Sequence, residues 1–230
     1  MSFPRGGARG GQVLADFMGS QRILFRFSKE GEARFLSHHD LMRLFERALR
    51  RAALPVRMTQ GFNPHPKLSI LSALPLGMEA SNEALETEFD PPVAPADVLA
   101  RLGSQLPGGI RLHGAELLPP GARIRVESVV YEAELPAEGG PWPAQAERFL
   151  ARRSVPVERV GPSGPRTLDV RPAVEAMSIE KGRLSLRVRV AEGGTPKAAE
   201  VFAAAFGCQA SAPLRRVAVN LAIVSPPGKG

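Results

Sequence analysis

The sequence contains a single cysteine, Cys208, among 230 residues. One cysteine excludes an internal disulfide and any metal site built from several cysteines. It fits a reducing compartment, and a cytoplasmic location is expected. No uninterrupted apolar run approaches the roughly 20 residues of a membrane-spanning helix, so no membrane partner is expected.

The motifs of familiar enzymes are also missing. The sequence contains no glycine-rich phosphate loop and no HExxH zinc motif, and its residue spacing indicates no nucleophile triad. Neither a cofactor nor a metal is therefore expected. The chain has one Trp and one Tyr, and neither predicted sheet face presents the aromatic pair with which RNA-recognition sheets stack bases. This argues against base stacking on a sheet and leaves contacts with a nucleic-acid backbone open.

Positive charge, in contrast, is abundant. The formal net charge is +7 and the sequence pI is about 10.4. Such a chain favours anionic partners, with nucleic acid first and an anionic membrane surface or an acidic protein behind it. An arginine-rich composition shared by the whole source proteome is the alternative reading. Residues 1–20 are rich in glycine and arginine and lack the apolar segment of a signal peptide, which predicts a flexible tail.

Residues 21–120 predict one α+β unit. Ile23, Phe25 and Phe27 are expected on one face and Arg22, Arg26 and Ser28 on the other, as in a half-buried strand. Ser37 is a candidate N-cap for a helix over residues 38–52. The remaining elements expected in this unit are strands near 55–59, 68–73 and 85–89, a helix from Pro95 and a strand over 110–118.

Residues 121–225 predict a second unit in the same order. Pro55 and Pro156 follow similar arginine-containing segments, and Pro95 and Pro196 each open a helix, both pairs at an offset of 101 residues. These landmarks predict an internal duplication. Each copy is expected to be a ferredoxin-like βαββαβ unit, with an antiparallel sheet and helices on one face. The elements expected here are strands over 123–135, 155–160, 166–170, 184–190 and 217–223, and helices over 142–152 and from Pro196.

The outward faces of the predicted strands carry charges of both signs. In a ferredoxin-like unit the first and third strands are neighbours, so cross-strand ion pairs are expected. The residues concerned are Arg22 and Arg26 with Glu86 and Glu88 in the first unit, and Arg183, Arg187 and Arg189 with Glu132 and Glu134 in the second.

The stretch "GFNPHPK", residues 61–67, lies between two short apolar segments. Its two prolines remove backbone donors and favour extended geometry in the residues before them, so the segment is expected along a sheet edge or over the surface. Because residues two apart share a face of an extended chain, Asn63, His65 and Lys67 are predicted to point together toward a partner. In the alternative, a rigid loop inserts Phe62 into the core and the polar groups cap nearby backbone.

A second group, "SHHD" at residues 37–40, stands at the start of the first predicted helix. Unpaired amides at a helix start favour anions, whereas Asp40 opposes them. A metal site with His65 is not expected, because His38 and His39 are adjacent and point roughly 100° apart on a helix.

Four arginines follow on the same helix, opposite its apolar stripe: Arg43, Arg47, Arg50 and Arg51. They form either an anion-binding surface or a solvated face on which the negative charge of Glu46 weakens the positive potential.

The segments "RFSKEGEARFLSHHDLMRLFERALRRAALPV" and "GFNPHPKLSILSALPLGMEA" resemble the radical-SAM-linked domain family of uncharacterised function. The resemblance covers roughly residues 22–90 and extends less distinctly beyond them. It implies cooperation with a radical-SAM enzyme, on RNA or the translation apparatus. This chain lacks the three-cysteine cluster motif of such an enzyme. His39 departs from the leucine expected at that place and is the weakest site candidate.

These observations predict a non-catalytic accessory protein that binds RNA, a ribosomal component or a radical-SAM partner through the edge of the first unit. The alternatives are a metal-independent endoribonuclease with His65 as general acid and base, and a pure protein adaptor. The predicted binding residues are Arg26, Lys29, Ser37, His38, Asp40, Arg43, Arg47, Phe62, Asn63, His65 and Lys67.

Overall fold

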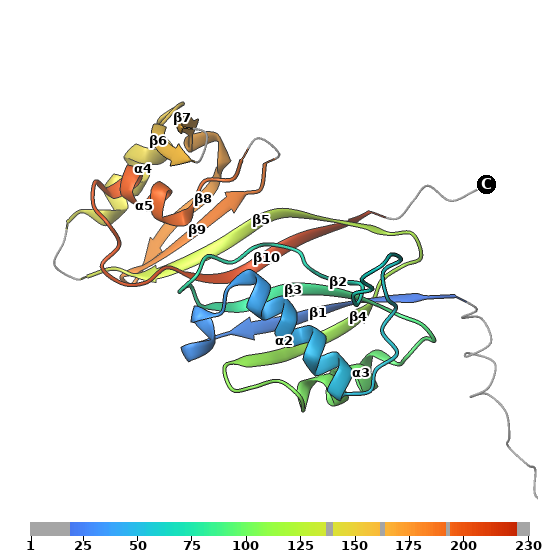
Figure 1. Cartoon of the computed structure of the whole chain (residues 1–230). Coiled ribbons are helices and arrows are strands. Elements are labelled where there is room, and N and C mark those ends of the chain that lie inside the picture. The colour runs from blue at the N-terminus through green and yellow to red at the C-terminus, as the bar shows by residue number, and fades with distance from the viewer. Residues whose placement is uncertain (1–18, 137–139, 162–163, 192–193, 225–230) are drawn as a thin grey trace, which may run out of the picture.

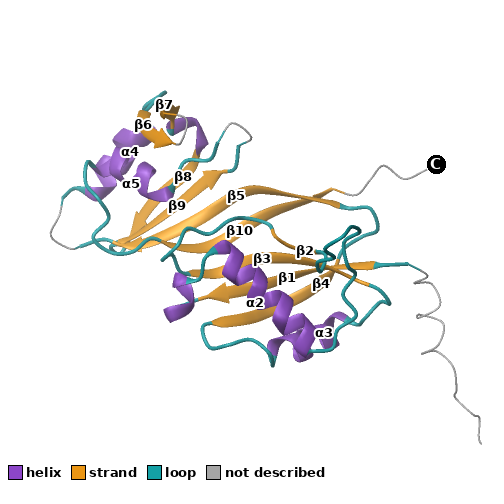
Figure 2. Ribbon diagram, in the orientation of Figure 1, coloured by secondary structure: helices purple, strands orange, loops and turns teal. Residues whose placement is uncertain are grey.

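A computed structural model describes residues 19–136, 140–161, 164–191 and 194–224 of the chain. The protein has a mixed α+β fold with a mostly antiparallel sheet, as expected (Figures 1 and 2). Most of the predicted N-terminal tail lies outside the described residues. None of the helices in the described part is long and apolar enough to span a membrane.

From residue 19 onward, the first half of the chain contributes four strands and two α-helices to this fold. Strand β1 leads through the short 3-10 helix η1 into α2, and α3 connects β3 to β4. The bounds are β1 (Gln21–Lys29), η1 (Gly31–Phe35), α2 (His38–Arg51), β2 (Leu68–Ile70), β3 (Ala80–Phe89), α3 (Pro95–Gly103) and β4 (Ile110–Leu117).

The described residues of the second half form six strands and two α-helices. Its longest strands, β5 and β10, lie beside one another and run antiparallel. The bounds are β5 (Arg123–Glu134), α4 (Trp142–Leu150), β6 (Pro156–Gly161), β7 (Gly164–Asp169), the 3-10 helix η2 (Arg171–Ala173), β8 (Val174–Glu180), β9 (Arg183–Arg189), α5 (Ala198–Phe206) and β10 (Arg215–Val224).

One continuous sheet joins the two halves. Its strand order is β4-β1-β3-β10-β5-β9-β8, and β2 pairs separately with β3. All neighbours are antiparallel except β3 and β10, which are parallel and meet at Ala80 and Arg216. Figure 1 shows α2 and α3 against the first half of the sheet and α4 and α5 against the second. Each half has its own apolar core beneath its helices.

The predicted apolar patterns of the first half account for its core. Phe25 and Phe27 of β1 are fully buried, and the Phe27 ring meets that of Phe45 on α2 edge to face at 5.1 Å. Ser37 caps α2 as predicted, since its hydroxyl accepts a hydrogen bond from the Asp40 amide. Aromatic and aliphatic burial of this kind provides most of the stability of such a helix–sheet layer.

Three predicted elements need correction. The segment 55–59 forms only isolated bridges, at Val56 and Met58, because prolines on both sides limit its ladder. The segments near 155–160 and 166–170 pair with each other as a β6–β7 hairpin outside the main sheet. The sheet position expected for them is taken by β8, which the apolar pattern did not indicate.

An ion pair is buried where the two halves of the sheet meet. Arg216 of β10 and Glu83 of β3 each have 2% of their side-chain surface exposed and form a bidentate hydrogen bond. Arg216 also donates to the hydroxyl of Ser72, to its carbonyl and to the carbonyl of Ala73. The pair therefore connects the second half to the first and fixes the loop before β3.

Candidate functional site

The "GFNPHPK" stretch forms the outer part of a narrow surface ribbon. The Thr59 amide donates to the His65 carbonyl at 2.7 Å, and the His65 amide donates to the Thr59 hydroxyl at 2.9 Å. Below them, the Lys67 amide donates to the Arg57 carbonyl at 2.8 Å. We call residues 57–67 the ribbon and residues 60–64 its tip. The prolines leave it outside the central sheet, as predicted.

Glu88 of β3 fixes the base of the ribbon. Its carboxylate accepts hydrogen bonds from Arg57 at 2.6 Å and from Lys67 at 2.8 Å, and it is itself only 14% exposed. Burial acts to raise the pKa of Glu88, but hydrogen bonds from Lys67, Ser20 and Arg57 outweigh it and lower the pKa to about 2. One carboxylate thus holds both strands of the ribbon.

The low pKa of Glu88 predicts a pH-dependent contribution to stability. Because the folded-state pKa of about 2 lies below the ordinary 4.5, the contribution is full above about pH 4.5 and is lost as the pH falls toward 2. We expect Glu88→Gln to lower the free energy of unfolding near neutral pH and to approach the wild type only at about pH 2 and below, as the pH falls through the folded-state pKa. Urea unfolding across this range measures the difference. Glu134→Gln, at an exposed ion pair, is the control, and a difference independent of pH would contradict the assignment.

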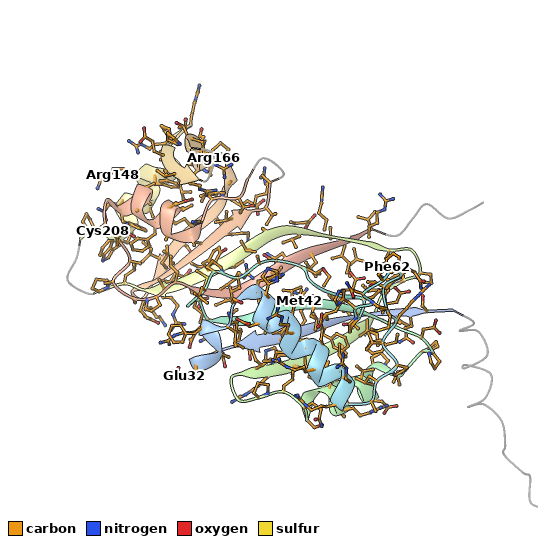
Figure 3. All side chains as sticks on the ribbon, in the orientation of Figure 1. Glu32, Met42, Phe62, Arg148, Arg166 and Cys208 are labelled. Atoms are coloured by element: carbon orange, nitrogen blue, oxygen red, sulfur yellow. The ribbon has the colours of Figure 1, made fainter. Side chains whose placement is uncertain are left out.

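The outer part of the ribbon carries accessible side chains. Phe62 and Asn63 in the tip are exposed, Phe62 with a relative exposure of 106%, and His65 next to the tip is also exposed. Phe62 therefore does not fill the core, which removes the alternative of an inserted loop. In the view of Figure 3, Phe62 lies at the opposite end of the first half from Glu32. Lys67 is half-buried and bound to Glu88, so it supports the ribbon more than it faces a partner.

The "SHHD" group is engaged mainly with its own helix start. The Ser37 hydroxyl donates to the Asp40 carboxylate at 2.6 Å, and this hydrogen bond is the main cause that lowers the pKa of Asp40. The rings of His38 and His39 are exposed, with centroids 5.9 Å apart. The His, Cys, Asp and Glu side chains of the described residues form no group of three that could hold a metal ion.

Three arginines form a row along the outer face of α2. Arg43, Arg47 and Arg50 are exposed, and at spacings of four and three residues they share one helix face. Within the described part of the chain none of them has an ion-pair partner. Arg51, the fourth predicted member, donates to the Gln105 carbonyl at 2.6 Å. We call the three residues the arginine row.

Two predicted binding residues are used inside the fold. Lys29 is 1% exposed and its ammonium donates to the Leu36 carbonyl at 2.7 Å; burial lowers its pKa. Arg26 is half-buried and donates to the Val219 carbonyl at 2.7 Å, and burial lowers its pKa as well. Arg26 lies where β10 passes over the face of β1 that was predicted to be open. Neither side chain is available to a partner.

The predicted cross-strand ion pairs form only in part. Arg22 bonds Glu86, and Arg183 bonds Glu134 at 2.7 Å. Arg189 pairs instead with Glu175 on β8, at 2.8 Å, because β8 occupies the position next to β9 that the sequence pattern did not assign.

The structure also contains a hollow that the predicted site does not include. It has a volume of 690 Å³ and lies where β9 ends beside β5. Its lining includes Arg125, Arg187, Arg189, Ser128 and Asn220. The alternating arginines of β9 are the sequence signal for it, but they were interpreted as ion-pair partners.

Comparisons with known proteins identify a family but assign no activity to it. Comparison with the curated proteins finds no match. Among solved structures, the crystal structure of an unknown protein from Galdieria sulphuraria is similar at 16% identity and a TM-score of 0.25, over 87% of this chain and 100% of that chain. Similarity at this level supports no conclusion about fold or function. A family model described as "Uncharacterized protein conserved in bacteria (DUF2344)" matches residues 22–199, which span both halves of the sheet. The chain therefore belongs to this DUF2344 family of uncharacterised conserved bacterial proteins.

Proposed function

We propose that this protein is a non-catalytic accessory protein that binds RNA and acts with a radical-SAM enzyme. The observation that carries the proposal is the arginine row of Arg43, Arg47 and Arg50 on α2, exposed and without an acidic partner in the described structure. A net charge of +7 supports it.

The row suits a phosphate backbone. Side chains three and four residues apart on a helix have Cβ atoms about 5–6 Å apart, which is comparable with the spacing of successive phosphates along a nucleic-acid strand. Guanidinium groups bind phosphate oxygens in a bidentate manner. Contacts of this type position a nucleic acid without reading its sequence, so the row predicts binding that depends little on sequence.

The ribbon provides a second group of polar contacts. Asn63 in the tip and His65 next to it are exposed, and both side chains can donate hydrogen bonds to phosphate or to a base edge. The ordering cost on binding is small because the ribbon is already held by Glu88 and by its own backbone hydrogen bonds.

We also infer that the two halves are tandem ferredoxin-like copies. In the first half the strands lie in the order β4-β1-β3, with β2 pairing the far side of β3, and in the second the order is β10-β5-β9-β8. Within each half the fourth, first, third and second sheet strands follow one another, which supports a duplication. The β6–β7 hairpin would then be an insertion in the second copy.

The proposal of a radical-SAM partner rests on the sequence resemblance. This chain has one cysteine, so the cluster that starts radical-SAM chemistry would be held by the partner. In that arrangement the protein described here supplies the RNA-binding surface and the partner supplies the reaction.

A salt titration of RNA binding tests the proposal. With a fluorescein-labelled RNA of about 12 nucleotides, within the usual site size of single-strand binders, we expect the logarithm of affinity to fall linearly with the logarithm of salt concentration. Three arginine–phosphate contacts predict a slope of about −2 or steeper, since each contact on a single strand contributes about −0.7.

Other outcomes of this experiment would favour one of the alternative functions. Absence of binding at low salt would contradict the proposal and favour a protein adaptor. Cleavage of the RNA that disappears in His65→Ala would favour the endoribonuclease, whereas intact RNA agrees with a non-catalytic role.

A further inference from the structure

Phe62 is the most exposed large apolar side chain in the described part of the protein. Its relative exposure is 106%, whereas Phe35, the other exposed aromatic side chain of that part, is 53% exposed and has the Arg34 guanidinium over its ring at 4.6 Å. Full exposure of an aromatic ring to water is unfavourable by the hydrophobic effect, and nothing in the fold of the ribbon requires an aromatic residue there.

The ring is presented on a firmly held support. Two backbone hydrogen bonds and one side-chain hydrogen bond close the ribbon below the tip, at Thr59, His65 and Lys67. Beneath these, Glu88 ties Arg57 to Lys67. Since the tip spans only residues 60–64, little conformational freedom remains to be lost when Phe62 meets a ligand.

The tip places amide side chains near Phe62 in the sequence and carries no acidic residue. Gln60 and Asn63 belong to the tip, no Asp or Glu occurs between Arg57 and Ile70, and the other exposed large apolar side chain of the ribbon, Met58, is 40% exposed. An exposed ring with amide side chains one and two residues away fits a nucleobase, whose face stacks on the ring and whose edge forms hydrogen bonds with amides.

We propose that Phe62 stacks on an unpaired base, so that the RNA bound by this protein is single-stranded where it meets the ribbon. The inference rests on the proposed RNA-binding function and specifies its substrate class. Stacking of this kind accepts any base, because every base has a π face. Gln60 and Asn63 flank the stacked base and supply hydrogen bonds to its edge.

Variants of Phe62 test the inference with two RNA probes, a single-stranded oligoadenylate and a blunt duplex of the same length. We expect Phe62→Ala to weaken binding of the single strand about 5- to 150-fold, the range measured for loss of one stacked base, and to leave duplex binding unchanged. Phe62→Trp should retain single-strand affinity, and its added indole emission should be quenched by oligoadenylate. The chain has one other Trp, Trp142, whose signal in the parent protein is subtracted.

Phe62→Leu separates stacking from apolar contact. It keeps an apolar side chain without a π face, so we expect it to behave like Phe62→Ala. Full affinity in Phe62→Leu, or an unquenched Phe62→Trp, would overturn the inference and indicate an apolar receiving site such as a protein pocket. If the wild type binds RNA with a steep salt dependence and Phe62→Ala binds the single strand equally well, the inference fails and the proposed function stands. If the wild type binds no RNA, the proposed function itself fails.

Discussion

Replacement of Arg216 by methionine is expected to lower the free energy of unfolding by about 3–5 kcal/mol, the usual cost of leaving one partner of a buried ion pair without the other. Arg216 and Glu83 are each 2% exposed. In Arg216→Met the carboxylate of Glu83 would remain buried without its bidentate partner, and the loop at Ser72 and Ala73 would lose three hydrogen bonds. For a domain with a typical total stability of about 5–15 kcal/mol, this is a large fraction.

Equilibrium unfolding in urea measures the change, and two variants serve as controls. Arg183→Met removes the same type of side chain from the Arg183–Glu134 pair, whose side chains are 59% and 64% exposed, and should change stability little. The double variant Arg216→Met with Glu83→Leu removes both charges and should be more stable than Arg216→Met alone. Equal effects at the buried and exposed pairs would show that burial does not determine the contribution of Arg216.

The second large effect is expected from charge reversal in the arginine row. Arg43→Glu with Arg47→Glu should abolish detectable RNA binding at moderate salt, because two attractive contacts with phosphate become repulsive ones. Both residues are exposed on α2, so the fold should persist with an unchanged far-ultraviolet circular dichroism spectrum. The milder Arg43→Gln with Arg47→Gln should bind more weakly and reduce the steepness of the salt dependence by about 1.4, or 0.7 for each contact.

A matched control distinguishes a specific surface from general charge. Arg152→Glu with Arg153→Glu makes the same change in net charge at two exposed positions of the second half. We expect this protein to bind RNA with nearly the wild-type affinity. Equal losses in the two double variants would indicate that only the overall charge attracts RNA, and the arginine row would no longer be a site.

Short-range patterns in the sequence were sufficient for the first strand and the first helix. The alternation from Ile23 to Phe27 matches β1, and the Ser37 cap together with the apolar stripe matches α2. In both cases the local preference and the tertiary packing favour the same conformation, so the pattern is informative. The ribbon could also be placed at the surface, since its prolines restrict it whatever the rest of the fold does.

The role of individual charges could not be predicted in this way. Lys29 was predicted to bind a partner, but β1 continues through it and Lys29 is buried with Phe27. Arg216 stands in a strand where arginine normally indicates solvent, and its burial depends on Glu83, which is 133 residues away. Pairings over such distances leave no local pattern.

The second half was harder to predict than the first because it contains two hairpins, β6–β7 and β8–β9, and only β8–β9 belongs to the main sheet. Residues 155–170 have the alternation of strands, yet β6 and β7 pair only with each other. Strand β8 lies at the sheet edge, where one side of a strand is free and apolar alternation is weak; only Val174 and Met177 in it are buried. Edge strands are therefore the elements that a period-two pattern identifies least well.

The central position of β10 has a consequence for how the chain is completed during synthesis. Strand β10 lies between β3 and β5, although it comes last among the described strands. On the ribosome, β5 (Arg123–Glu134) emerges well before residues 215–224, so the edge of β5 that pairs with β10 stays open until the last strand has been synthesised. An unpaired edge of this kind attracts other chains, and truncation before β10 would leave the edge of β5 permanently open.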